Sequence, residues 1–232
     1  MPTVLTPPPR DEVEAIGAVF LLSVAHGRLL DAAASLSPDD VRSPTLLDGW
    51  TVAHLLTHLS RNADAIRGML DGVARDEIVP MYPGGAAQRD GDIDAGSVRY
   101  LAAILEDLHS ATVALDARIA ETPLGSWTSE VQTRTGRLKA WQLVWLRWRE
   151  VEIHMADLGR GARMSEAFTA RALFELVETA PDRLQNFAAV ELCTDAIPLA
   201  TLRGPGSVRL ILDGSPTDLV LWLTGRAALA PW

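Results

Sequence analysis

The stretch WREVEIHMADLGRG (residues 148–161) places a carboxylate and an imidazole one helical turn apart, at Glu150 and His154. Side chains four residues apart in an α-helix point the same way. Gly159 and Gly161 are residues that commonly end a helix. Apolar residues surround the pair on two sides, with Leu143, Leu146 and Ile153 on its own face and Trp141, Trp145 and Trp148 opposite. This pattern predicts a buried helix that carries two polar side chains on one face.

Three further stretches have helical periodicity and extend the prediction to a four-helix bundle. The predicted helices run from Asp11 to about Ser35, from the N-cap Thr51 to about Val73, from near Ser97 to about Glu121, and from about Ala140 to Leu158. Between the second and third helices, IVPMYPGGAAQRDGDIDAG is predicted to be a long irregular loop, and such loops are often functional. A short hairpin-like piece, SWTSEVQTRTGRLKA, precedes the fourth helix.

The sequence changes character after about residue 160. A predicted helix from about Ser165 to Ala180 is followed by three short strands in AVELC, IPLATLRG and SVRLILDG. A last helix begins at SPTD and ends near Arg226. The predicted fold class is therefore α+β, with a helical bundle in residues 1–162 and a small α+β domain in residues 163–232.

The composition excludes several classes of function. The chain has 232 residues, 48% of them hydrophobic, and a formal net charge of -9, so binding to nucleic-acid backbones is not expected. The longest mainly apolar run, residues 16–25, is about half of what spans a bilayer, and the N-terminus lacks the pattern of a secretory signal. The single cysteine, Cys193, excludes an intrachain disulfide. We expect a cytoplasmic monomer with no membrane or nucleic-acid partner.

Glu150 and His154 are ordinary zinc ligands that need a third ligand from another helix. The helix after Thr51 contains His54 and His58, in TVAHLLTHLSRNADAI. Leu55, Leu59, Ile66 and Leu70 define its apolar arc. His58 shares an edge of that arc and His54 lies farther round, so we predict His58 as the ligand and His54 at the surface or rim. Three protein ligands leave a fourth position open, as in catalytic zinc sites.

Simpler interpretations of the pair stay open on spacing alone. A Glu and a His one turn apart are often solvated, and Arg147 has the spacing to pair with Glu150. Burial favours the metal, because an unpaired buried carboxylate carries a desolvation penalty that a dication would offset. Asn62 and Asp157 could each orient a ligand imidazole, or take part in ordinary helix hydrogen bonding.

Taken together, the segments GWTVAHLLTHLSRNADAI, PMY and WLRWREVEIHMADLG resemble the mycothiol-dependent maleylpyruvate isomerases, which belong to the DinB-like metalloenzymes. The likeness covers most of the chain, including the small C-terminal domain. It implies a DinB-like four-helix bundle in which His58, Glu150 and His154 bind zinc. It also implies a catalytic role for Arg226, in LTGRAAL, and for Arg89, in the long loop. Without the resemblance, Arg226 is a helix C-terminal cation favoured by the dipole.

The resemblance implies cis–trans isomerisation of maleylpyruvate to fumarylpyruvate. Cys193 lies in an apolar strand-like stretch typical of inert packing, so the nucleophile would come from mycothiol, a low-molecular-weight thiol that zinc would hold as a thiolate. The thiolate adds to the activated double bond, the bond rotates, and expulsion of the thiolate leaves the trans isomer. Arg226 and Arg89 would pair with the substrate carboxylates or with the developing enolate charge.

Met81, Tyr82 and Asn62 are predicted to line the pocket on the side of the cofactor. The same metal and thiol chemistry would serve a mycothiol S-transferase, which adds the thiolate to another electrophile and stops. A third hypothesis is a non-catalytic DinB-like metal-binding protein, which would bind zinc without turning over thiol or maleylpyruvate.

Overall fold

The computed structural model of this chain describes residues 9–159, 163–179 and 184–226. It divides into two compact units, one containing the elements α1 to α5 and the other the elements α6 to α7. The first unit is helical apart from one short hairpin, and the second combines helices with a small sheet. The α+β fold class predicted from the sequence is confirmed.

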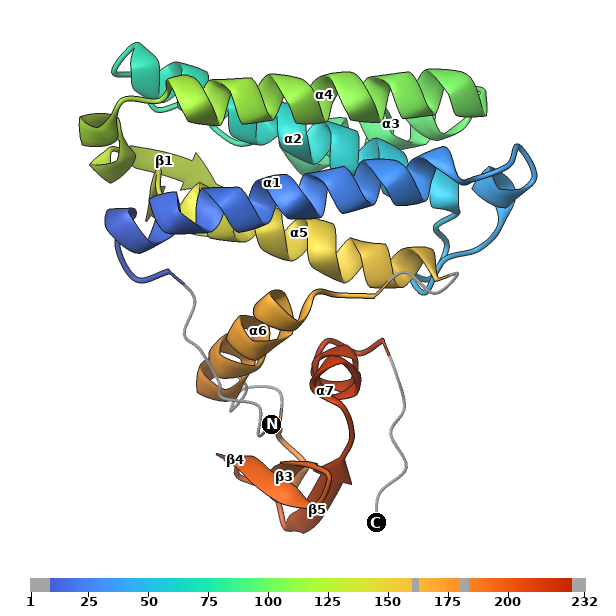
Figure 1. The fold of residues 1–232 in the computed structure, drawn as a ribbon, viewed down its shortest axis with the longest axis vertical. Helices are drawn as coiled ribbons and strands as arrows, with labels where there is room; N and C mark the ends of the chain where they lie inside the picture. Colours follow the sequence, from blue (N-terminus) through green and yellow to red (C-terminus); the bar gives the residue numbers. More distant parts are fainter. Residues whose placement is uncertain (1–8, 160–162, 180–183, 227–232) are drawn as a thin grey trace. The chain divides into compact units, whose positions relative to one another are not determined.

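Four long helices lie side by side in the first unit (Figure 1). They are α1 (Glu12–Ala34), α2 (Val52–Ala74), α4 (Leu101–Glu121) and α5 (Gln142–Leu158), each within a few residues of the predicted range. Their apolar faces meet in one core, in which Leu22, Leu55, Leu108 and Val151 are fully buried. Because α2 packs against both α4 and α5, side chains on different faces of α2 meet different partners.

Local capping sets the ends of the helices that carry the predicted ligands. The Thr51 hydroxyl lies 2.7 Å from Nδ1 of His54, and the Thr51 backbone N–H donates to the same nitrogen, so the two residues cap the start of α2. Gly159 follows α5 with a φ of +69°, which favours glycine and ends the helix. Gly161 lies outside the described residues.

A further helix, α3 (Gly85–Ser97), occupies much of the segment predicted to be an irregular loop, so that prediction was wrong. The sequence of α3 contains three glycines and has no apolar stripe, and its buried residues are Ile93, Gly96 and Ser97. A Cβ on Gly96 would lie 2.3 Å from the Thr57 side chain, so glycine allows α3 to pack closely on α2. This tertiary contact overrides the weak helix propensity of the segment.

The predicted hairpin before α5 is present. It follows a 3₁₀ turn, η2 (Leu124–Thr128), and consists of β1 (Glu130–Thr133) paired antiparallel with β2 (Gly136–Lys139). The Met81 backbone N–H donates to the carbonyl oxygen of Gln132 at 2.9 Å, next to an isolated parallel bridge between Pro80 and Gln132. The hairpin and the segment before α3 are therefore joined to each other. A second 3₁₀ turn, η1 (Asp40–Arg42), lies between α1 and α2.

The second unit contains a three-stranded sheet and two helices. Its elements are α6 (Glu166–Thr179), β3 (Phe187–Thr194), β4 (Ile197–Arg203), β5 (Val208–Asp213) and α7 (Pro216–Leu223). The strand order is β4-β3-β5, with β3 antiparallel to β4 and parallel to β5. Cys193 is buried in β3, which agrees with its interpretation as a packing residue. Arg226 follows the end of α7 and is not part of it.

In the described part of the chain, α1 is the one helix long and apolar enough to cross a membrane by length and composition. The whole helix, Glu12–Ala34, is longer than its mainly apolar run of residues 16–25. One face of α1 is part of the bundle core, with Leu22, His26 and Leu29 buried.

A buried polar network crosses the bundle between α1, α2, α4 and α5. Arg147 is fully buried, and its Nη1 donates to the carbonyl oxygen of Leu59 at 2.9 Å and to Oδ1 of Asn62 at 2.8 Å. Its Nε donates to Nε2 of His26 at 3.1 Å. Because Nε2 accepts, the His26 proton is on Nδ1, which lies 2.7 Å from the Asp116 carboxylate. The described hydrogen bonds of Arg147 thus go to Leu59, Asn62 and His26. None of them goes to Glu150, with which its spacing in the sequence would allow it to pair.

Burial lowers the pKa of His26 and outweighs the hydrogen bond to Asp116, which acts in the opposite direction. Burial also lowers the pKa of Arg147 to about 10. The folded protein therefore favours neutral His26 beside a charged Arg147. An unfolded chain would protonate the same histidine more readily.

The network predicts a pH dependence of stability. A histidine whose pKa is lower in the folded state contributes stability above its unfolded pKa of about 6.5, and this contribution falls as the pH drops below that value, by up to ~1.4 kcal/mol per pH unit. We expect the free energy of unfolding, measured by urea denaturation between pH 7.5 and 5.5, to fall more steeply in the wild type than in His26→Gln. The exposed His109 provides the control, since His109→Gln should keep the wild-type slope. Equal slopes for wild type and His26→Gln would contradict the prediction.

Candidate metal centre and its cavity

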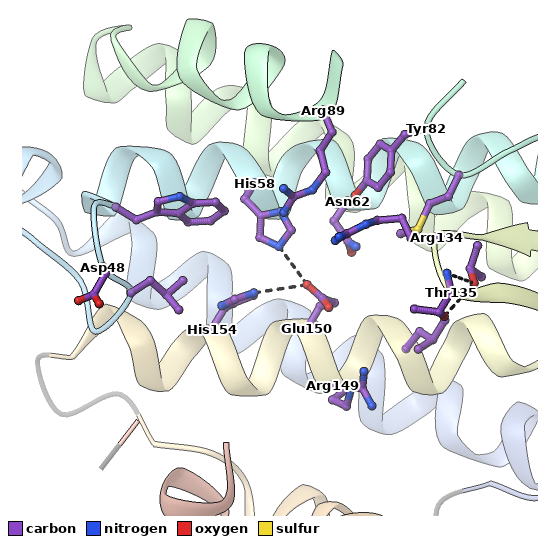
Figure 2. A pocket seen from close by; sticks show the side chains of 15 residues that line it. Asp48, His58, Asn62, Tyr82, Arg89, Arg134, Thr135, Arg149, Glu150 and His154 are labelled. Carbon is purple, nitrogen blue, oxygen red and sulfur yellow. Dashed lines mark hydrogen bonds and ion pairs between the residues drawn. The ribbon is translucent and has the colours of Figure 1, made fainter. Parts of the chain in front are cut away.

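Three predicted ligand side chains from two helices converge in the first unit. His58 comes from α2, and Glu150 and His154 come from α5, with their donor atoms all within 4.8 Å of one another (Figure 2). Nε2 of His58 lies 2.9 Å from Oε2 of Glu150, and Nε2 of His154 lies 3.4 Å from the same oxygen. Ligand atoms around one tetrahedral zinc ion are about 3.4 Å apart, given bonds of ~2.1 Å. Two imidazoles and a carboxylate at this spacing fit a zinc ion in donor chemistry and in separation.

The cluster is largely withdrawn from solvent. The side chains of His58, His154 and Glu150 are 5%, 12% and 30% exposed, respectively. Burial opposes the ionisation of Glu150, but the hydrogen bonds from His154 and His58 outweigh it and hold the pKa of the carboxyl well below its usual range. Glu150 is thus an anion inside the bundle, and its partners are the two imidazoles.

The two histidines differ in their surroundings. Nδ1 of His154 donates to Oδ2 of the buried Asp157 at 2.7 Å, which leaves Nε2 directed at Glu150. Burial lowers the pKa of His154, but the bonds to Asp157 and Glu150 outweigh it and the pKa is raised. Burial lowers the pKa of His58, and here the hydrogen bond to Glu150 does not compensate. A carboxylate on the second nitrogen of an imidazole is the usual arrangement around a ligating histidine.

Arg89 contacts the other ring nitrogen of His58. Its Nη2 donates to Nδ1 at 3.2 Å, and its guanidinium carbon lies 5.9 Å from the ring centres of both Trp50 and Tyr82. Arg89 belongs to α3, and not to a loop as predicted. The helix holds its guanidinium against aromatic rings and one imidazole, at the edge of the cluster.

His54 occupies a different place from His58, as predicted from its position on the helical face. Its Nδ1 is engaged with Thr51 at the start of α2, and its Nε2 lies 3.8 Å from the exposed Asp94 carboxylate. His26 belongs to the buried network with Arg147, and His109 is exposed on α4.

The cluster opens into a cavity of about 540 Å³. Of the residues predicted to bind the cofactor or to act in catalysis, Asn62, Met81, Tyr82 and Arg89 line it. Asn62 does not contact an imidazole through a described hydrogen bond, and its side-chain oxygen instead accepts from Arg147. Arg226 belongs to the second unit, where its Nη1 donates to the carbonyl oxygen of Thr224 at 3.0 Å. That contact is the one expected of a cation at the C-terminal end of a helix.

Several lining residues were not identified from the sequence. They are Leu47, Asp48, Trp50, Thr133, Arg134, Thr135, Leu146 and Arg149. The ring of Trp50 lies 5.4 Å from the His58 ring. The sequence offered a clue to this position, because Trp50 stands immediately before the N-cap of α2, about two turns from His58. Arg134 and Thr135 had none, because which end of a hairpin faces the cavity depends on how the hairpin packs.

The fold and the cluster together define a helical bundle with a candidate metal centre, joined in one chain to a small α+β unit. Residues 22–159 match the family described as mycothiol maleylpyruvate isomerase N-terminal domain. Since the match covers more than half of the sequence, this chain belongs to that family.

Two solved structures share the fold of this chain. One is a crystal structure of the mycothiol-dependent maleylpyruvate isomerase, and the other is a crystal structure of a histidine-to-alanine mutant of it. Each superimposes with a TM-score of 0.84 and 23% sequence identity, over 94% of this chain and 92% of the other. A sequence search of curated proteins found no match.

The geometry predicts which histidine on α2 supports metal binding. The protein as purified with zinc should contain about one equivalent, and His58→Ala should lose most of it, because one of three ligands is removed. His54→Ala is the matched control, since it removes a histidine one turn away that caps the helix, and it should keep the metal. Zinc content is measured by atomic emission on folded protein. Full zinc retention in His58→Ala would exclude His58 from the site.

Proposed function

We propose that this protein is a zinc- and mycothiol-dependent cis–trans isomerase that converts maleylpyruvate to fumarylpyruvate. The observation that carries the proposal is the convergence of His58, Glu150 and His154 at one cavity, in a chain of the mycothiol maleylpyruvate isomerase family. The solved structures of the same fold are those of a mycothiol-dependent maleylpyruvate isomerase and its mutant, and the name of that enzyme supports the choice of substrate.

His58, Glu150 and His154 would hold the zinc ion through Nε2, a carboxylate oxygen and Nε2, respectively. In that arrangement the His58 proton would be on Nδ1, so Arg89 would no longer donate to that nitrogen. Zinc, when bound, would keep a coordinated thiol deprotonated at neutral pH. The chain prepares this site through its own residues. Glu150 is held as an anion, and Asp157 fixes the His154 ring with its Nδ1 proton turned away from the centre. Trp50 packs against the His58 ring and shields it from solvent.

The thiol itself would come from mycothiol. The one cysteine of the chain, Cys193, is buried in β3 and is not a candidate nucleophile. In the proposed reaction the mycothiol sulfur forms a C–S bond at the activated double bond, and the electron pair moves to the adjoining carbonyl as an enolate. The new single bond rotates, the enolate returns its electrons, and the C–S bond breaks to release the thiolate and the trans acid.

The enolate and the substrate carboxylates require cationic partners. Arg89 is suited to this role, because it lines the cavity and its guanidinium lies beside the candidate metal ligand His58. We also propose that Arg226 pairs with a substrate carboxylate. The support for Arg226 comes from its match to the family pattern in the sequence.

An assay with and without mycothiol tests the reaction. Maleylpyruvate absorbance should change in the presence of zinc-loaded protein and mycothiol, and not with either alone, because the mechanism needs an external thiolate. Equal turnover without thiol would exclude addition and elimination. Consumption of mycothiol into a stable adduct would instead identify an S-transferase. Zinc binding with no reaction of either substrate would identify a non-catalytic metal-binding protein.

A second prediction concerns Arg226. If its guanidinium pairs with substrate, Arg226→Ala should lower kcat/KM about tenfold or more, as expected for the loss of a charge-assisted hydrogen bond. Zinc content should stay unchanged. The alternative is a helix-end cation, for which the same variant would lose at most ~1 kcal/mol of stability and keep the wild-type turnover. Kinetics and thermal unfolding of the one variant therefore separate the two roles.

A further inference from the structure

An arginine not used by the proposed mechanism lies at the tip of the β1–β2 hairpin. Arg134 and Thr135 form the two-residue turn that joins the strands, and both line the cavity of the candidate metal centre. Figure 2 shows this turn and Asp48 on opposite sides of the His58–Glu150–His154 cluster. The turn therefore borders one end of the space into which the cluster opens.

The turn is held in place from two directions. The Thr133 hydroxyl donates to the carbonyl oxygen of Gly136 at 2.8 Å and accepts from the Thr135 backbone N–H at 3.3 Å. The Met81 backbone N–H, from the segment before α3, donates to Gln132 in the strand that leads into the turn. Because the backbone of the turn is already fixed, the ordering that a bound ligand requires is confined to the exposed Arg134 side chain.

The Arg134 side chain has no hydrogen bond or ion pair with any residue that the structure describes, although the chain carries 30 Asp and Glu residues. Arg137, three residues later on the same hairpin, pairs with Glu130 at 3.0 Å. Within the hairpin, Glu130 therefore neutralises Arg137, which is not among the residues that line the cavity, and leaves Arg134, which lines it, without a counter-charge. The carboxylates that line the cavity are those of Asp48 and Glu150, against three arginines, Arg89, Arg134 and Arg149, of which Arg89 already pairs with the exposed Asp90 at 2.6 Å. This balance favours an anionic ligand.

We propose that Arg134, assisted by the Thr135 hydroxyl, binds a carboxylate of the substrate and makes the cavity selective for dicarboxylates. A guanidinium can bind a carboxylate through two parallel hydrogen bonds, and the neighbouring hydroxyl supplies a third donor. Arg89, on α3, is the cationic group nearest to the metal ligands, so a ligand with two acidic ends can engage one arginine at each end. The identity of the substrate rests on the proposed function, whereas the preference for a dicarboxylate rests on the cavity itself.

Steady-state kinetics with maleylpyruvate tests the proposal. Arg134→Ala should raise KM for maleylpyruvate about tenfold to a hundredfold, the range expected for one charge-assisted contact, with kcat, KM for mycothiol and zinc content unchanged. Arg134→Lys should recover part of the loss, because it keeps the charge but not the paired donors. Arg137→Ala is the matched control and should behave as wild type. A KM for Arg134→Ala equal to that of Arg137→Ala would overturn the proposal.

A binding experiment separates this proposal from the proposed function. Maleate, a cis dicarboxylate that does not react, is titrated calorimetrically into zinc-loaded wild type, Arg134→Ala and Arg137→Ala. A loss of affinity of about tenfold in Arg134→Ala alone supports the subsite, even if the wild type isomerises nothing. Equal affinity in the three proteins, or no binding of maleate by the wild type, would overturn it.

Discussion

A carboxylate held between two imidazoles is the interaction on which the rest of the site depends. Glu150 is an anion within the bundle, and its oxygen lies within 3.4 Å of a histidine from α2 and of another from α5. A charge in such a place is tolerated when it is paired and hydrogen-bonded. The same requirement brings α2 and α5 into a fixed register, because a slip of one turn in either helix would separate the three side chains.

Next to this cluster, a network of hydrogen-bonded polar side chains continues through the core. Arg147 donates to Asn62, which lines the cavity, and to His26, which in turn meets Asp116. Among the charges that favour the protonated form of Arg147, the largest effect is that of Glu150. The buried Arg147 cation thus offsets the charge of the partly exposed Glu150 anion at a distance, without an ion pair that would occupy the Glu150 oxygens. The carboxylate stays available to the two histidines and to a cation placed between them.

The cavity is completed by elements outside the four long helices. Arg89 comes from α3, Trp50 from the segment before α2, and Arg134 from the hairpin. The backbone hydrogen bond between Met81 and Gln132 links the segment before α3 with the hairpin, so two of these walls are held as one piece. The bundle supplies the candidate metal ligands and Arg149, whereas the segments between its long helices supply the other two lining arginines and the rings of Trp50 and Tyr82.

The sequence by itself determined the four long helices, the hairpin, the α+β second unit and the placement of His58, and not His54, beside the pair on α5. These features follow from helical periodicity, capping and the two-residue alternation of strands, which are local properties of the chain. It also placed Glu150 and His154 on one helical face.

The tertiary structure alone decided α3, whose glycine-containing sequence becomes helical because it packs closely on α2. It likewise decided that Arg147 donates to Asn62 and His26, and that Arg134 lines the cavity while Arg137 does not. The reason is the same in each case: these side chains take their partners from segments distant in sequence, and spacing along the chain carries no information about which segments meet.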